Sequence, residues 1–169
     1  MTNLETLRAF VALPLNEALV AELDRVQGEL KPHLPDAAVR WVRPSKIHLT
    51  LFFIGDVLRS RIEPTTEALR VIADNTAPFA FTAEGVGVFP HARRPRVLWV
   101  GLSESSRRPL SVLHAAVNEA MENLGFTPDT RPFTPHLTIG RVRRRASGRE
   151  VRAIGEVMSD IQVGTLVQV

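Results

Sequence analysis

The tripeptide His-Leu-Thr occurs twice in this chain of 169 residues, at residues 48–50 and 136–138. The second histidine follows the first by 88 positions, about half the length of the chain. Each copy lies in a short apolar run, at residues 47–55 and 136–142, and such runs predict strands. The recurrence indicates an ancient duplication, so we expect two similar lobes that face one another.

Hairpins and helices alternate along the sequence. Besides the two motif strands, we expect strands at residues 8–13, 39–42, 79–89, 96–102 and 162–169. Helices are expected at residues 16–30, with Asn16 as the cap, and at 63–74, 109–124 and 149–158. This mixed order predicts an α+β fold with antiparallel sheets and outer helices rather than a doubly wound parallel sheet.

Composition excludes several classes of protein. The absence of cysteine rules out disulfides, thiolate zinc sites and cysteine nucleophiles. No apolar run approaches the roughly 20 residues that cross a bilayer, and the first residues have no basic segment followed by an apolar one. We therefore expect one domain over residues 1–169, located in a reducing cytoplasm, with no membrane association.

The basic residues are nearly all arginine, 19 of 21, although the net charge is only +3. Two groups stand out, one at residues 93, 94 and 96 and another at 141 and 143–145. Arginine's planar fork suits phosphate, so these groups are typical of nucleic-acid contacts. Solvated loops explain them equally well, because a GC-rich genome encodes arginine often.

The repeated motif places polar side chains together. Residues two apart share a face of a strand, so His48 points with Thr50 and His136 points with Thr138. The intervening leucines point to a core. Two imidazoles can act as base and acid at one phosphodiester, while the hydroxyls donate to the non-bridging oxygens. A metal site is the weaker interpretation, because each motif lacks a carboxylate or second histidine.

With these motifs and their flanking segments, the chain resembles the 2H phosphoesterase superfamily and, within it, the RNA 2',3'-cyclic phosphodiesterases, formerly called 2'-5' RNA ligases. The first motif, with its lead-in, reads Arg-Trp-Val-Arg-Pro-Ser-Lys-Ile-His-Leu-Thr-Leu at residues 40–51. The second reads Arg-Pro-Phe-Thr-Pro-His-Leu-Thr-Ile at residues 131–139. An opening strand at residues 8–13 and a central hairpin at 87–99 extend the resemblance.

The resemblance implies two lobes around a central cleft and hydrolysis of a terminal 2',3'-cyclic phosphate to a 2'-phosphate, with no cofactor or metal. His48 and His136 carry over as the catalytic pair, and Thr50 and Thr138 as phosphate ligands. By analogy His136 activates water and His48 protonates the 3' oxygen. The implied partner is RNA with a cyclic phosphate end, or a cyclic nucleotide, and no obligate protein partner is inferred.

Two further residues match family positions. Arg141 matches a position near the phosphate, but strand parity puts it on the face opposite His136. It therefore needs a bulge or the strand's end at Gly140 to reach the site. Phe10 matches an aromatic position that stacks a base, and a core phenylalanine is the alternative.

Two other functions remain open at this stage. The same residues can run the reverse reaction and join RNA ends through a 2'-5' linkage. A non-catalytic nucleotide or RNA-binding module is the third hypothesis. The family usually continues beyond the last strand, so an ending at Val169 leads us to expect an incomplete lobe or an exposed sheet edge.

Overall fold

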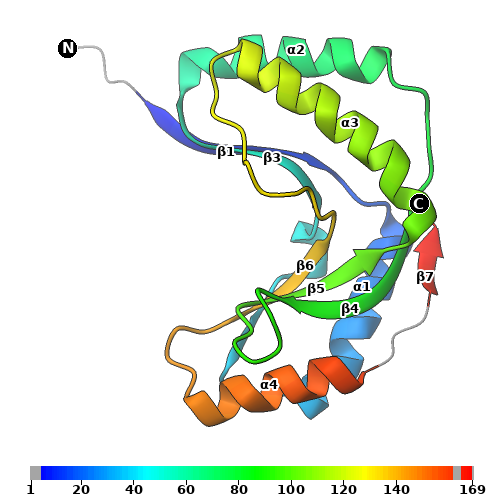
Figure 1. Cartoon of the computed structure of the whole chain (residues 1–169), viewed down its shortest axis with the longest axis vertical. Helices are drawn as coiled ribbons and strands as arrows, with labels where there is room; N and C mark the ends of the chain where they lie inside the picture. Colours follow the sequence, from blue (N-terminus) through cyan, green and yellow to red (C-terminus); the bar gives the residue numbers. More distant parts are fainter. Residues whose placement is uncertain (1–4, 162–164, 169) are drawn as a thin grey trace. The chain divides into compact units, whose positions relative to one another are not determined.

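The computed structural model describes residues 5–161 and 165–168 (Figure 1). Its strands are β1 (Thr6–Leu13), β2 (Val39–Trp41), β3 (Leu49–Leu58), β4 (Thr82–Phe89), β5 (Val97–Leu102), β6 (Leu137–Val142) and β7 (Thr165–Gln168). Its helices are α1 (Glu17–Leu30), α2 (Ile62–Asp74), α3 (Glu104–Asn123) and α4 (Gly148–Asp160), with 3-10 turns η1 (Lys31–His33), η2 (Pro44–Lys46) and η3 (Arg59–Arg61). The predicted α+β class is confirmed. Of the last predicted strand, residues 162–164 and 169 lie outside the described residues.

The chain divides into two compact units, each built from three separate segments. The first unit contains the chain up to Leu13, Thr50–Phe79 and Arg107–Pro135. The second contains Pro14–Leu49, Ala80–Ser106 and the chain from His136 onward. One boundary thus falls inside strand β3, and another falls directly before His136.

In the first unit, β1 and β3 are hydrogen-bonded neighbours, and helices α2 and α3 accompany them. Leu113, Val117 and Met121 follow one another at four-residue intervals along α3, which places them on one face of the helix. They form the buried core with residues from β1 and β3, namely Val11, Leu51 and Phe52. The helical spacing of the sequence therefore produces the packing of this unit.

In the second unit, antiparallel strands lie in the order β6-β5-β4-β7, with β2 paired to β6. Asn16 caps helix α1, as predicted, by accepting a hydrogen bond from the backbone N–H of Leu19 at 2.9 Å. The helix buries an apolar stripe at three- and four-residue intervals, formed by Leu19, Leu23, Val26 and Leu30. The alternating strand residues Leu98, Val100, Leu137 and Ile139 are buried too. The other face of these strands carries half-buried residues, Trp99 and Thr138 among them.

Helix α3 begins at Glu104, five residues before the predicted start at Pro109. The prediction was wrong because proline favours the first helical position, and we placed it there. In the structure Ser103 precedes the first turn, where its carbonyl accepts a hydrogen bond from the Ser106 N–H at 3.1 Å. The serine hydroxyls also lie 2.7 Å apart.

A buried amide ties helix α1 to the edge where β2 and β6 pair. The side chain of Gln27 is 1 % exposed. Its Nε2 donates to the carbonyl oxygens of Val42 at 2.6 Å and Ile139 at 3.0 Å. Both amide hydrogens are therefore used, one on the residue that follows β2 and one on a residue inside β6.

We predict that Gln27→Leu lowers the free energy of unfolding by about 1–3 kcal/mol, because the Val42 carbonyl is left buried without its donor. Urea denaturation measures this value. Asp24→Leu, an exposed change on the same helix, is the matched control and should leave stability nearly unchanged. Equal effects of the two substitutions would contradict a structural role for the amide.

Candidate active site

The two His-Leu-Thr segments meet where β3 and β6 begin. Leu49, the first residue of β3, pairs with Leu137, the first residue of β6, in antiparallel register. Both leucines have 0 % exposure, so the predicted inward direction of these side chains is confirmed. His48 and His136 each lie one residue before their strand and are half-buried. The structure therefore brings together both motifs that the sequence singled out.

Both histidines belong to the second unit. We had expected one from each lobe, but the pairing of Leu49 with Leu137 gives the first residue of β3 its contacts in the second unit. Continuing this register by one residue places His48 opposite Thr138. His136 is then the diagonal neighbour of His48, and diagonal neighbours in an antiparallel pair lie roughly 7–8 Å apart. Two imidazoles that start from such positions can hold one phosphate between them.

The threonine hydroxyls lie on the faces of their histidines. Thr138 is two residues after His136 and is half-buried opposite Trp99 of β5. Thr50 is two residues after His48 and is also half-buried, although it belongs to the first unit. Because side chains two apart share a face of a strand, each motif presents an imidazole and a hydroxyl on the same side.

The ring of His48 is oriented by the turn before it. Its Nδ1 lies 2.9 Å from the carbonyl oxygen of Lys46, in the 3-10 turn η2. A carbonyl oxygen only accepts, so in this hydrogen bond Nδ1 carries the proton. In the neutral ring the lone pair is then on Nε2, which is the nitrogen through which His48 can exchange a proton with a substrate.

The ring of His136 packs on an aromatic pair that sequence reasoning did not connect with it. Phe89, the last residue of β4, contacts His136 edge to face, with ring centroids 4.9 Å apart. Phe89 in turn lies 5.2 Å from Trp99. Gly87 faces the Trp99 ring so closely that a Cβ there would lie 2.3 Å from it. A glycine inside a strand is the sequence signal that indicates such a close approach.

A register shift brings Arg141 to the face of the motif. Arg141 pairs with Val97, but Trp99 pairs with Thr138, so β6 has one extra residue between these pairs. Val97 and Trp99 share a face, and directly opposed residues share a face as well. The exposed side chain of Arg141 therefore lies on the side of Thr138. This is the bulge that the sequence-based prediction required.

A second arginine stands directly opposite the first and was not predicted. Arg40 of β2 pairs with Arg141 across the antiparallel register, and both side chains are exposed. Neither guanidinium forms an ion pair with an acidic side chain in the described part of the chain. Like charges in this position destabilise a sheet. An anion between them would relieve the repulsion, so the pair is suited to bind phosphate.

Phe10 lies in the first unit, on β1, and its side chain is 48 % exposed. The alternative that it is a core residue is therefore wrong. Phe53, on β3 of the same unit, is 62 % exposed. Exposed aromatic rings of this kind can stack on a nucleotide base.

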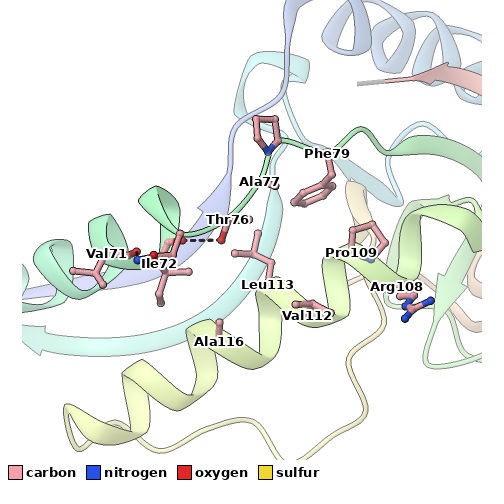
Figure 2. A pocket seen from close by; sticks show the side chains of 12 residues that line it. Val71, Ile72, Thr76, Ala77, Phe79, Arg108, Pro109, Val112, Leu113 and Ala116 are labelled. Carbon is pink, nitrogen blue, oxygen red and sulfur yellow. Dashed lines mark hydrogen bonds between the residues drawn. The ribbon is translucent and has the colours of Figure 1, made fainter.

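A cavity of about 650 Å³ lies in the first unit between the end of α2 and helix α3 (Figure 2). Val71, Leu113 and Phe79 supply apolar walls, and Arg108 is its charged residue. This lining suits an apolar group better than a phosphate. Within residues 5–161 and 165–168, no three acidic or histidine side chains gather in a way that could hold a metal ion.

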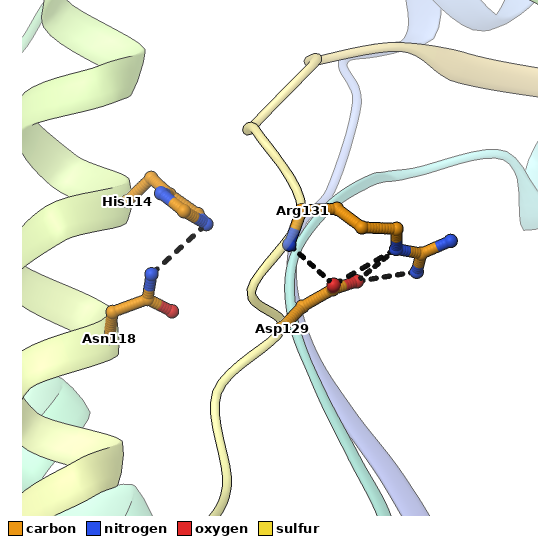
Figure 3. A network of polar contacts seen from close by, with 4 residues as sticks. All are labelled: His114, Asn118, Asp129 and Arg131. Carbon is orange, nitrogen blue, oxygen red and sulfur yellow. Dashed lines mark hydrogen bonds and ion pairs between the residues drawn. The ribbon is translucent and has the colours of Figure 1, made fainter.

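The loop before His136 packs against helix α3, and Figure 3 shows the polar contacts within the helix and within the loop. His114 stacks on Phe133 with centroids 3.8 Å apart and planes 8° apart, and Asn118 Nδ2 lies 3.4 Å from its Nε2. Arg131 forms an ion pair with Asp129 in the loop and holds the pKa of that carboxyl down at about 2. The loop is thus anchored to α3 three residues before His136, and His114 has a structural role in this contact.

The chain belongs to the LigT-like phosphoesterase family. The family's sequence profile matches residues 13–99 and 100–165. Each matched segment holds one His-Leu-Thr, as expected of a duplicated ancestor. The resemblance drawn from the motifs is therefore confirmed.

Two relatives carry the name RNA 2',3'-cyclic phosphodiesterase. The one from Methanothermobacter thermautotrophicus is 34 % identical over 160 residues, which are 94 % of this chain and 84 % of that protein. The one from Geobacillus stearothermophilus is 37 % identical over 132 residues, which are 78 % of this chain and 41 % of that protein. This chain thus spans less than half of the Geobacillus relative.

Solved structures share the fold. A Thermus thermophilus protein superposes with a TM-score of 0.68 at 29 % identity, covering 83 % of this chain and 77 % of its own. Escherichia coli LigT, solved in complex with 3'-AMP, gives a TM-score of 0.64 at 27 % identity and covers 85 % of this chain and 78 % of its own.

We predict that Arg40→Gln and Arg141→Gln each weaken binding of inorganic phosphate about 10- to 100-fold, since each removes a charged donor worth roughly 1.5–3 kcal/mol. Calorimetric titration measures the affinity. Arg149→Gln, an exposed change on α4, is the control. Wild-type affinity in both site variants would show that the opposed arginines do not bind the anion.

The pKa of His114 lies below its ordinary value of 6.5 because burial disfavours the charged ring, with Asp129 acting weakly in the opposite sense. The unfolded chain therefore takes up this proton at higher pH than the folded protein does. Stability should fall as the pH drops below about 6.5. His114→Phe keeps the ring on Phe133 but removes the titration, so its unfolding free energy should change less between about pH 7.5 and about pH 5.5. An unchanged pH slope in His114→Phe would contradict this source of the pH dependence.

Proposed function

We propose that this protein hydrolyses the terminal 2',3'-cyclic phosphate of RNA, or a nucleoside 2',3'-cyclic phosphate, to a 2'-phosphate. The observation that carries the proposal is the pairing of Leu49 with Leu137, which brings His48 and His136 within reach of one phosphate. The names of the Methanothermobacter and Geobacillus relatives support the same activity. The complex of E. coli LigT with 3'-AMP supports a nucleotide ligand.

In the proposed mechanism, His136 acts as the base and His48 as the acid. Neutral His136 takes a proton from a water molecule, whose oxygen forms a bond to phosphorus. The bond from phosphorus to the 3' oxygen breaks, and protonated His48 gives its Nε2 proton to that oxygen. The Nδ1 hydrogen bond to Lys46 keeps the His48 ring oriented while the proton leaves. Each proton transfer contributes about 10²–10⁴-fold to the rate.

The remaining polar residues stabilise the charge that develops on the phosphate. The hydroxyls of Thr50 and Thr138 donate hydrogen bonds to the non-bridging oxygens. Arg141 supplies a planar, permanently charged donor on the face of Thr138, a position that its register shift supports. Phe10, exposed on β1, is the proposed stacking partner of the nucleotide base.

We also propose that residues 1–169 work as one two-lobed domain and that the protein acts in the cytoplasm. Sequence supports the location through the absence of cysteine, which fits a reducing compartment. No helix in the described part of the chain is long and apolar enough to span a bilayer.

The test is turnover of adenosine 2',3'-cyclic phosphate in the presence of EDTA. We expect wild type to yield the 2'-phosphate, and His48→Ala or His136→Ala to lower kcat by about 10²–10⁴-fold each. Thr50→Val and Thr138→Val should lower it by about 10²-fold. His33→Ala, at an exposed histidine, should behave as wild type.

Two outcomes decide between the rival functions. If wild type binds the nucleotide but does not hydrolyse it, the protein is a binding module and the proposed reaction is wrong. If a cyclic-phosphate oligonucleotide is joined to an acceptor with a 5'-hydroxyl faster than it is hydrolysed, ligation is the activity. Locating the product phosphate by its 2' or 3' position completes the assignment.

A further inference from the structure

An arginine-lined groove runs between helix α4 and the loop that joins β4 to β5. Its volume is about 780 Å³, and it lies wholly in the second unit. Figure 1 shows the loop next to α4. Five arginines from three segments line the groove: Arg93, Arg94, Arg96, Arg144 and Arg152. The first arginine group of the sequence thus shares this groove with Arg144 of the second group and with Arg152 of α4.

The walls of the groove are fixed in place by packing. Gly155 of α4 lies against the loop so closely that a Cβ there would be 1.9 Å from the carbonyl oxygen of Ala92. At the start of α4, Ser147 and Glu150 form a reciprocal capping box. Pro95 anchors the loop by its buried side chain. The arginines therefore project from two elements that are held against each other.

The groove carries an excess of positive charge. All five arginines are exposed, and none forms an ion pair with an acidic side chain among the described residues. Glu156 and Asp160 also line the groove, near the C-terminal end of α4. Five positive and two negative side chains leave a clear positive excess. Guanidinium groups spread along a groove fit several successive phosphates better than a single one.

The groove is connected to the candidate active site through the ends of the loop. Phe89, which contacts the ring of His136, is the last residue of β4. The backbone N–H of Arg96 donates to the Phe89 carbonyl at 2.7 Å and closes the loop. The loop that carries Arg93, Arg94 and Arg96 therefore closes on Phe89, the residue that packs against the His136 ring.

From these observations we infer that the groove binds the backbone phosphates of single-stranded RNA whose cyclic end lies at His48 and His136. This inference rests on the proposed function. Among the described residues, those that line the groove include no aromatic side chain on which a base could stack. Binding therefore occurs through phosphates, independent of base sequence, and longer RNA binds more tightly than a mononucleotide.

The test compares two pairs of substitutions in the full chain that remove the same charge from the same unit. Arg94→Gln with Arg152→Gln alters the groove, whereas Arg145→Gln with Arg149→Gln alters exposed arginines outside its lining. The binding probe is a fluorescent RNA of about ten nucleotides that ends in a 2'-phosphate. Turnover is measured on the same RNA with a cyclic end and on adenosine 2',3'-cyclic phosphate.

We expect the groove pair to raise the Kd for the RNA about tenfold, and to reduce the slope of log K against log salt by about 1.4, or about 0.7 per phosphate. KM for the cyclic-ended RNA rises in parallel, while kcat and the KM for the mononucleotide stay unchanged. The matched pair should bind RNA as wild type does.

Equal weakening by the two pairs overturns the inference, as does an equal rise in KM for the mononucleotide. If wild type turns over neither substrate, the proposed function fails. The Kd measurements with the fluorescent RNA then still decide whether the groove binds RNA, because they need no catalysis.

Discussion

The pairing of Leu49 with Leu137 is the contact on which the candidate active site depends. Burial of a leucine side chain contributes about 1.5–3 kcal/mol, and these two are fully enclosed. Because side chains alternate along a strand, fixing the leucines in the core turns the histidines and threonines to the other face. The hydrophobic effect thus sets the direction of polar groups that contribute nothing to the core themselves.

Around this contact, several features lower the stability of the sheet. Arg40 and Arg141 oppose each other at a cost to the sheet, and β6 departs from regular pairing beside them. Gln27 satisfies the carbonyl of Ile139 within that irregular stretch from the buried side. Local destabilisation of this kind is typical of functional sites in natural proteins.

Sequence reasoning recovered the features that depend on local pattern. The paired motifs, the alternation that buries Leu49 and Leu137, and the need for a bulge before Arg141 all follow from strand periodicity. Features that depend on which strands become neighbours were missed. Phe89 reaches His136, and Arg40 reaches Arg141, only through strand order and register. A single sequence does not specify either.

The same limit explains the placement of the histidines. The repeated tripeptide showed that the two motifs are alike, but it did not show which compact unit each motif joins. Local pattern also misplaced the start of α3, since Pro109 and Ser103 both favour the beginning of a helix. The sequence left two interpretations of Phe10, a core residue or a base-stacking residue, and the exposure of its side chain excludes the first.

The extra residue in β6 has a consequence for how this segment can evolve. Loss of one residue between Thr138 and Arg141 would restore regular pairing and leave the arginine two residues after the threonine, so the two side chains would still share a face. A point substitution at Ile139 would leave that orientation intact. Among descendants of this gene, a spacing from the second threonine to the arginine that is shorter by one residue should therefore occur together with a β6 that lacks the bulge.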